Sequence, residues 1–121
     1  MLGTDYNEQG KNFFTWEQLK WQLDRINNSC YPAILKSPII LCMSTCYGIN
    51  ATKCDNYSSP GNRAAHVIIG HDDTILWDDA HKAFNQFYLS LLRDCKTVSD
   101  AVTDMNSAIG TPNYFVAKYL Y

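Results

Sequence analysis

Short unbroken apolar runs alternate along the chain with longer stretches in which apolar residues recur every three or four positions. Unbroken runs bounded by turn residues are typical of buried strands, and the three-to-four spacing is typical of amphipathic helices. The runs at about 39–43, 64–70 and 114–120 therefore predict strands. The order along the chain is helix, strand, long loop, strand, helix, helix and strand, which predicts an α/β fold.

Local signals mark where the first helix begins and ends. Thr15 is a good N-cap, and Gln18 three residues later completes a capping box. Phe14 can pack on Leu19 as a hydrophobic staple. The helix ends at the polar run 27–29, and its apolar stripe at helical spacing consists of Trp16, Leu19, Leu23 and Ile26. This helix should cover one face of the sheet.

Two further helices follow the second strand. The longer one runs from about Asp78 to Asp94, and Asp78 and Asp79 lie at its amino end, where the helix dipole favours acidic side chains. A carboxylate pair for acid–base chemistry is the other interpretation of these two residues, but the helix end explains them more simply. Thr97 caps the last helix, which Gly110–Pro112 stops.

The strand at 39–43 is apolar throughout, which predicts burial on both faces and a central place in a parallel sheet. The polar stretch from Ile49 to Asn62 predicts a long surface loop. No earlier stretch supplies a neighbouring strand, so one sheet edge should be open. We therefore expect a single, partial domain over residues 1–121, a layered α-β-α sheet of about three strands, the first two parallel, flanked by three helices.

Composition and charge exclude several classes of partner. The formal net charge is -2, from 10 basic and 12 acidic residues without a basic cluster, so no nucleic-acid partner is expected. No apolar stretch reaches the roughly 20 residues that cross a membrane, and the first residues do not form a signal peptide. The 5 cysteines lack CxxC spacing, which predicts free thiols, no metal or other cofactor, and a cytoplasmic location.

The functional interpretation depends on Cys46. The apolar run 39–43 ends in the small and polar residues of 44–48, so the thiol follows the carboxyl end of a predicted strand. Ligands and reacting groups of open α/β sheets gather beyond the carboxyl ends of the strands. A thiol there is positioned to attack an electrophile. A small buried residue at a strand end is the alternative.

Three segments taken in order resemble the caspase-like cysteine peptidases, which include caspases, metacaspases, clostripain-like and gingipain-like enzymes and CHAT proteins. They are residues 14–19 with 39–48, residues 64–70, and the helical pair from Trp77 to Val102. The resemblance implies that Cys46 is the nucleophile, that its backbone N–H is an oxyanion donor, and that Gly48 belongs to the oxyanion turn.

The chain also departs from this family. In caspase-like peptidases the general-base histidine lies upstream of the cysteine, in a His-Gly turn at the end of the preceding strand. No histidine precedes Cys46 here. The resemblance therefore implies the carboxyl-terminal half of the fold, without the family's base and without its second oxyanion donor.

A thiol without help is mostly protonated at neutral pH, so Cys46 needs a base. No role is expected for two of the three histidines, His66 in a strand and His81 on the solvent side of the long helix. His71 follows the second strand directly and should emerge beside Cys46, with Asp72 or Asp73 to orient it. A plain turn after the strand is the alternative for His71.

Two functions of different classes remain. The first is a cysteine endopeptidase, or a fragment of one, that hydrolyses peptide or protein substrates through Cys46 and is inactive alone if the upstream histidine is required. The second is a non-catalytic pseudo-peptidase that pairs through the open sheet edge with a second copy or an amino-terminal partner chain. A nucleotide-binding domain is a weaker third possibility, because no glycine-rich phosphate loop occurs.

Overall fold

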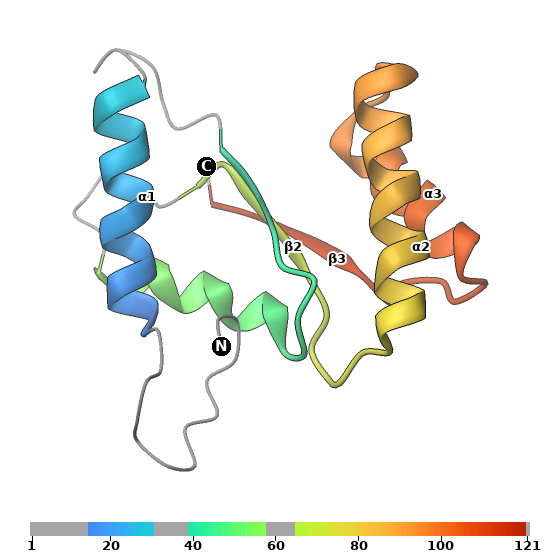
Figure 1. The fold of residues 1–121 in the computed structure, drawn as a ribbon, viewed down its shortest axis with the longest axis horizontal. Helices are drawn as coiled ribbons and strands as arrows, with labels where there is room; N and C mark the ends of the chain where they lie inside the picture. The colour runs from blue at the N-terminus through green and yellow to red at the C-terminus, as the bar shows by residue number, and fades with distance from the viewer. Residues whose placement is uncertain (1–14, 31–38, 58–64, 121) are drawn as a thin grey trace.

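A three-stranded mixed sheet divides the protein into layers (Figure 1). The computed structural model describes residues 15–30, 39–57 and 65–120. In chain order, the elements are the helix α1 (Trp16–Cys30), the strand β1 (Ile40–Cys42), the 3-10 helix η1 (Gly48–Tyr57), the strand β2 (Val67–Gly70), the helix α2 (Trp77–Tyr88), the π-helical segment η2 (Leu89–Arg93), the helix α3 (Val98–Ala108) and the strand β3 (Val116–Tyr119).

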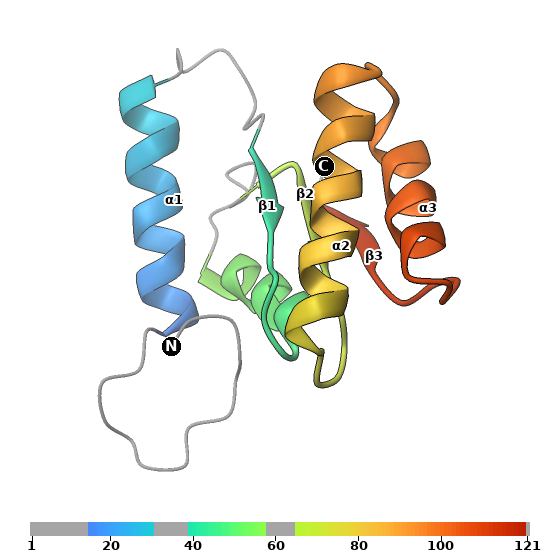
Figure 2. The ribbon, with the colours of Figure 1, turned by 45° about the vertical axis from the view of Figure 1, so that its right-hand side comes forward.

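The sheet has the order β1-β2-β3. β1 pairs parallel with β2, placing Leu41 opposite Ile68, and β2 pairs antiparallel with β3, placing Ile69 opposite Ala117. α1 and η1 pack against one face, and α2 and α3 pack against the other (Figure 2). The predicted α-β-α arrangement, with three strands of which the first two are parallel, is therefore confirmed.

Alternate residues of β2 supply two hydrophobic cores, because successive side chains of a strand point to opposite faces. Ile68 packs in the core that α1 and η1 cover, together with Leu19 and Leu23. Val67 and Ile69 point to the other face and belong to the second core. The other buried residues of that core are Ala83, Phe84, Phe87, Ala101, Met105 and Phe115.

The capping box predicted for the first helix is present. The Gln18 N–H donates to Thr15 Oγ1 at 3.1 Å, and the Thr15 N–H donates to Gln18 Oε1 at 2.8 Å. Of the predicted stripe, Leu19 and Leu23 are buried but Ile26 is 45% exposed. The predicted staple involves Phe14, which lies outside the described residues.

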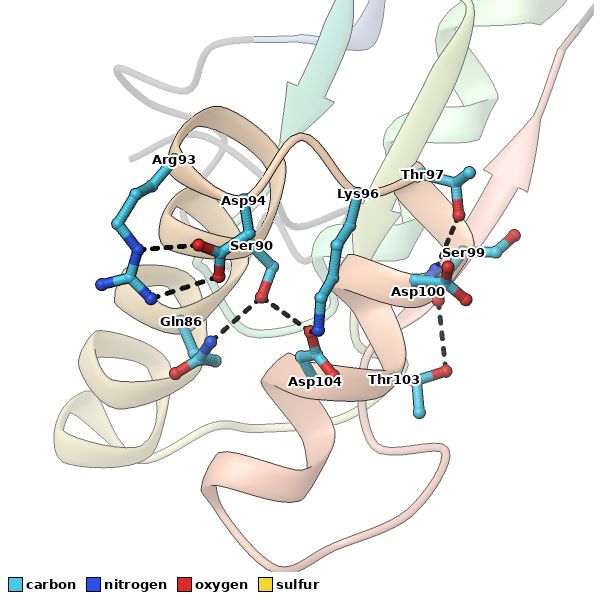
Figure 3. Close-up of polar contacts among 10 residues, drawn as sticks. All are labelled: Gln86, Ser90, Arg93, Asp94, Lys96, Thr97, Ser99, Asp100, Thr103 and Asp104. Carbon is cyan, nitrogen blue, oxygen red and sulfur yellow. Dashed lines mark hydrogen bonds and ion pairs between the residues drawn. The ribbon is translucent and has the colours of Figure 1, made fainter.

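The long helix predicted at 78–94 corresponds to α2 and η2, and Asp78 and Asp79 lie in its first turn. At η2 the buried Ser90 hydroxyl accepts a hydrogen bond from Gln86 at 3.0 Å and donates to Asp104 of α3 at 2.8 Å (Figure 3). Lys96 donates to the same Asp104 oxygen at 2.7 Å. We call Gln86, Ser90, Lys96 and Asp104 the helix junction.

β1 lies at the edge of the sheet within the part of the chain that the structure describes, so the predicted central position is wrong. Its three residues pair only with β2 and are half-buried, whereas all four residues of β2 are buried. An unbroken apolar run indicates cover on two faces, but it does not indicate whether strands lie on both sides. The central strand is β2.

The prediction of a long loop at 49–62 is also wrong for the part of this segment that the structure describes. Residues 48–57 form η1, and its Ala51 and Cys54 are fully buried against α1. These two small residues are three positions apart and therefore share one side of a 3-10 helix. The many Asn, Thr and Lys residues around them concealed this short apolar face.

Candidate functional site

The chain makes a tight turn after β1, and Cys46 lies in it. The Met43 N–H still donates to the Ile69 carbonyl at 2.9 Å, and the Gly48 N–H donates to the Thr45 carbonyl at 3.1 Å. Tyr47, directly after Cys46, has φ of 56°. A bulky residue with positive φ is an outlier, and backbone strain of this kind clusters at functional sites.

Two glycines allow this turn to pack closely against the end of β2. A Cβ on Gly48 would lie 2.7 Å from Met43 Cβ, and a Cβ on Gly70 would lie 2.6 Å from the Ile49 nitrogen. Both distances are shorter than side chains tolerate. Gly48 therefore allows the turn that contains Cys46 to approach Met43 closely.

The Cys46 thiol is half-buried and accepts a hydrogen bond from the Ile75 N–H, with 3.4 Å between nitrogen and sulfur. Among the described residues the Cys46 N–H has no hydrogen-bond acceptor. The neighbouring Thr45 Oγ1 is buried and likewise has no partner there. Buried polar atoms are almost always hydrogen-bonded, so Thr45 Oγ1 is an exception to that rule.

Cys46 lines a cavity of about 520 Å³ between the end of β1 and α2. Its wall is mostly apolar, with a few polar groups, which is the usual make-up of small-molecule and peptide sites. Trp77 belongs to this wall and is 92% exposed. The residues that line the cavity are Ser44, Thr45, Cys46, Ile75, Trp77, Ala80, His81, Phe84, Asn85 and Tyr88.

His71 lies at the carboxyl end of β2 but does not line this cavity. Its ring stacks on Tyr114 with 3.8 Å between centroids, and its Nδ1 lies 2.6 Å from the Tyr114 carbonyl oxygen, to which it donates in the neutral Nδ1–H form. Asp72 Oδ1 lies 3.6 Å from the same nitrogen, and Asp73 accepts from the Thr74 N–H. No hydrogen bond joins His71 to Cys46 in the described ranges.

His81 is the histidine that shares the cavity with Cys46. It lies on the first half of α2, is exposed, and its Nε2 lies 3.2 Å from the Asn85 side-chain amide nitrogen. The third histidine, His66, is exposed and meets Tyr119 edge-on at 5.8 Å between ring centroids.

Cys42 lies on β1 close to the cavity and in contact with Tyr88. Burial raises the pKa of the Cys42 thiol, although its hydrogen bond with Tyr88 opposes the rise. Burial, followed by the charge and the hydrogen bond of Cys42, raises the pKa of Tyr88 to about 12. A raised thiol pKa leaves less of the reactive thiolate, so Cys42 is a poor nucleophile.

The other two cysteines whose side chains are described lie away from this site. Cys54 is fully buried in η1, whereas Cys95 is exposed after η2. Both are free thiols, as are Cys42 and Cys46.

Over the ranges 15–30, 39–57 and 65–120, no group of three or more His, Cys, Asp or Glu side chains is arranged to hold a metal ion. In the same ranges no helix has the length and apolar content that crossing a membrane requires. The resemblance to caspase-like peptidases finds no support outside the sequence, because no family model, no curated protein and no solved structure matches the chain. It stays a prediction.

The sequence interpretation missed His81 and Asn85. A signal for them was present, because both fall in step with Trp77 at intervals of four residues and so share one side of α2. That side was interpreted as solvent-facing. Trp77, His81 and Asn85 are exposed as predicted, and they also border the cavity beyond β1.

Proposed function

We propose that the cavity beside Cys46 is the active site of a thiol-dependent peptide hydrolase, as the resemblance to caspase-like peptidases implies. The observation that carries the proposal is the placement of the thiol. Its sulfur lies beyond the carboxyl end of a parallel strand pair, lines the cavity, and receives the Ile75 N–H.

The same turn supports a role in binding the oxyanion. When a thiolate attacks a peptide carbonyl, negative charge develops on the carbonyl oxygen and is stabilised by fixed N–H donors. The Cys46 N–H has no acceptor among the described residues, and it is the donor that the resemblance assigns. Gly48 acts in this proposal by permitting the turn that holds the donor in place.

Labelling of the intact chain by an irreversible peptidyl electrophile tests this proposal. We expect Cys46 to be labelled in preference to the other four thiols, as measured by peptide mapping in a mass spectrometer. Cys42 and Cys54 are internal controls because burial disfavours their reaction, and Cys95 controls for simple exposure. Equal labelling of all five thiols would count against the proposal, as would no labelling of Cys46.

The outer edge of β1 supports a second candidate function. β1 has a strand on one side only within the described ranges, and an unpaired strand edge is a template for a further strand. In this alternative the chain is a non-catalytic module that pairs there with a second copy or with an amino-terminal partner chain. Sedimentation of the chain in dilute solution tests self-pairing, and a well-folded monomer argues against it.

A cytoplasmic location is part of the same proposal. The four cysteines with described side chains are free thiols, as expected in a reducing compartment. Nucleic acid and membrane are not proposed as partners.

A further inference from the structure

We infer that His81 takes the proton of the Cys46 thiol and that Asn85 orients His81, an inference that rests on the proposed function. The three side chains belong to the wall of one cavity. A cysteine, a histidine and an asparagine arranged around one site form a known solution for nucleophilic catalysis, and such sites are recognised by geometry and not by order in the sequence. Here the cysteine comes from the turn after β1, and the other two come from α2.

α2 presents His81 and Asn85 as a fixed pair. They are four residues apart, so they lie one above the other on the same side of the helix. The helix is anchored by Ala80, Ala83, Phe84 and Phe87, all of which are buried. A site on a well-packed helix holds its side chains more precisely than a site on a loop.

The contact between the two side chains determines which ring nitrogen of His81 carries the proton. Asn85 Nδ2 lies 3.2 Å from His81 Nε2. Oxygen and nitrogen of a side-chain amide exchange places when the amide rotates by half a turn. With the amide turned so that Oδ1 accepts from Nε2–H, the basic nitrogen of His81 is Nδ1, which is then free to accept the proton from the thiol.

His71 is less suited to this role. Its Nδ1 is held by the Tyr114 carbonyl at 2.6 Å, and its ring is stacked on Tyr114, so it belongs to the aromatic packing between β2 and β3. Its side chain is only 13% exposed. The sulfur of Cys46 makes no hydrogen bond to a histidine in the described structure, but catalytic hydrogen bonds in ligand-free sites are commonly long and shorten when substrate binds.

The reaction then balances without a cofactor. The Cys46 S–H proton passes to His81 Nδ1 while sulfur bonds to the peptide carbonyl carbon. The C–N bond breaks, the leaving amine takes the proton from His81, and a thioester remains. Water then gives a proton to His81 and its oxygen bonds to the carbonyl carbon. The C–S bond breaks, the acid leaves, and the proton returns to sulfur.

The test is the rate of Cys46 alkylation by iodoacetamide as a function of pH in the full-length chain. We expect His81→Ala to lower the rate at pH 7 by about a hundredfold and to move the rise of the profile to higher pH. His81→Gln should give the same loss. Lys82→Ala is the matched control, because Lys82 is an exposed neighbour on α2 that does not line the cavity, and it should leave the profile unchanged.

Asn85 acts through His81 in this inference, so its effect should depend on His81. Asn85→Ala should slow alkylation in the otherwise unchanged chain and have no further effect in the His81→Ala chain. His71→Ala should leave the pH profile in place. A profile that moves with His71→Ala and not with His81→Ala overturns the inference, whereas failure of the unchanged chain to react at Cys46 overturns the proposed function itself.

Discussion

Buried polar groups are hydrogen-bonded at the helix junction, whereas a buried polar group at the turn that contains Cys46 is unpaired among the described residues. At the junction the buried Ser90 hydroxyl has both a donor and an acceptor as partners, and Asp104 receives two hydrogen bonds (Figure 3). At the turn Thr45 Oγ1 is buried with no partner in the described structure.

This difference indicates that one region of the fold contributes to its stability and the other to its function. Satisfied polar groups stabilise the side of the sheet that α2 and α3 cover. Unpaired buried groups lower stability. The comparison therefore predicts that substitutions on the α3 side lower the free energy of unfolding, whereas substitutions of the unpaired groups at the turn affect reactivity.

The largest loss of stability is expected at Asn106 of α3. Its side chain is buried, donates to the Phe115 carbonyl at 2.9 Å and accepts from the Phe115 N–H at 2.8 Å. Asn106→Leu leaves both backbone groups unpaired and should lower the free energy of unfolding by about 3 kcal/mol, measured by urea denaturation. An unchanged free energy of unfolding for Asn106→Leu would show that the two hydrogen bonds do not stabilise the fold.

Two threonines give a more direct comparison. Thr97 caps α3 by accepting from the Asp100 N–H at 3.1 Å, whereas Thr45 Oγ1 has no described partner. Thr97→Val should lower the free energy of unfolding by about 1 kcal/mol. Thr45→Val removes an unpaired buried hydroxyl and should raise that free energy by about 1 kcal/mol. A loss of stability from Thr45→Val as large as that from Thr97→Val would remove the contrast between the two regions.

The smallest effect is expected for the exposed ion pair of the helix junction. Hydrogen bonds from Lys96 and Ser90 lower the pKa of Asp104, and the bond to Asp104 raises the pKa of Lys96. A lowered carboxyl pKa stabilises the fold above the unfolded value of about 3.9, and this contribution is lost as the pH falls through the folded value. The Lys96 contribution is present below its unfolded pKa of about 10.4 and is lost as the pH rises through its folded value.

Asp104→Asn should therefore be less stable than the unchanged chain at neutral pH and equally stable at low pH. Urea denaturation at several pH values measures the difference. In a Lys96→Met background the substitution should have a smaller effect. A difference that does not change with pH would contradict the assignment.

Local signals in the sequence were sufficient to predict the three α-helices and the layers. The Thr15 and Thr97 caps and the stripe on α2 involve neighbours within a few residues, so the sequence contains them directly. The edge position of β1 and the burial of η1 depend on which segments lie beside them in space. Composition does not determine that.

The candidate site also has a part that local signals predict and a part that depends on contacts between distant segments. A thiol at the end of the first strand could be predicted because the end of an apolar run marks that position. The histidine that shares its cavity could not, because His71 and His81 both follow β2 and only the position of α2 across the cavity from the β1 end brings His81 there. Stacking of His71 on Tyr114 joins residues 43 positions apart, which no local pattern reveals.

The most direct test of a functional Cys46 is the ratio of its alkylation rate to that of Cys95, measured at neutral pH in the folded chain and again in urea. Cys95 is exposed and Cys46 is half-buried, so exposure alone favours Cys95. We predict that Cys46 reacts faster than Cys95 in the folded chain and that the ratio falls to about one in urea. A folded chain in which Cys95 reacts faster contradicts the account.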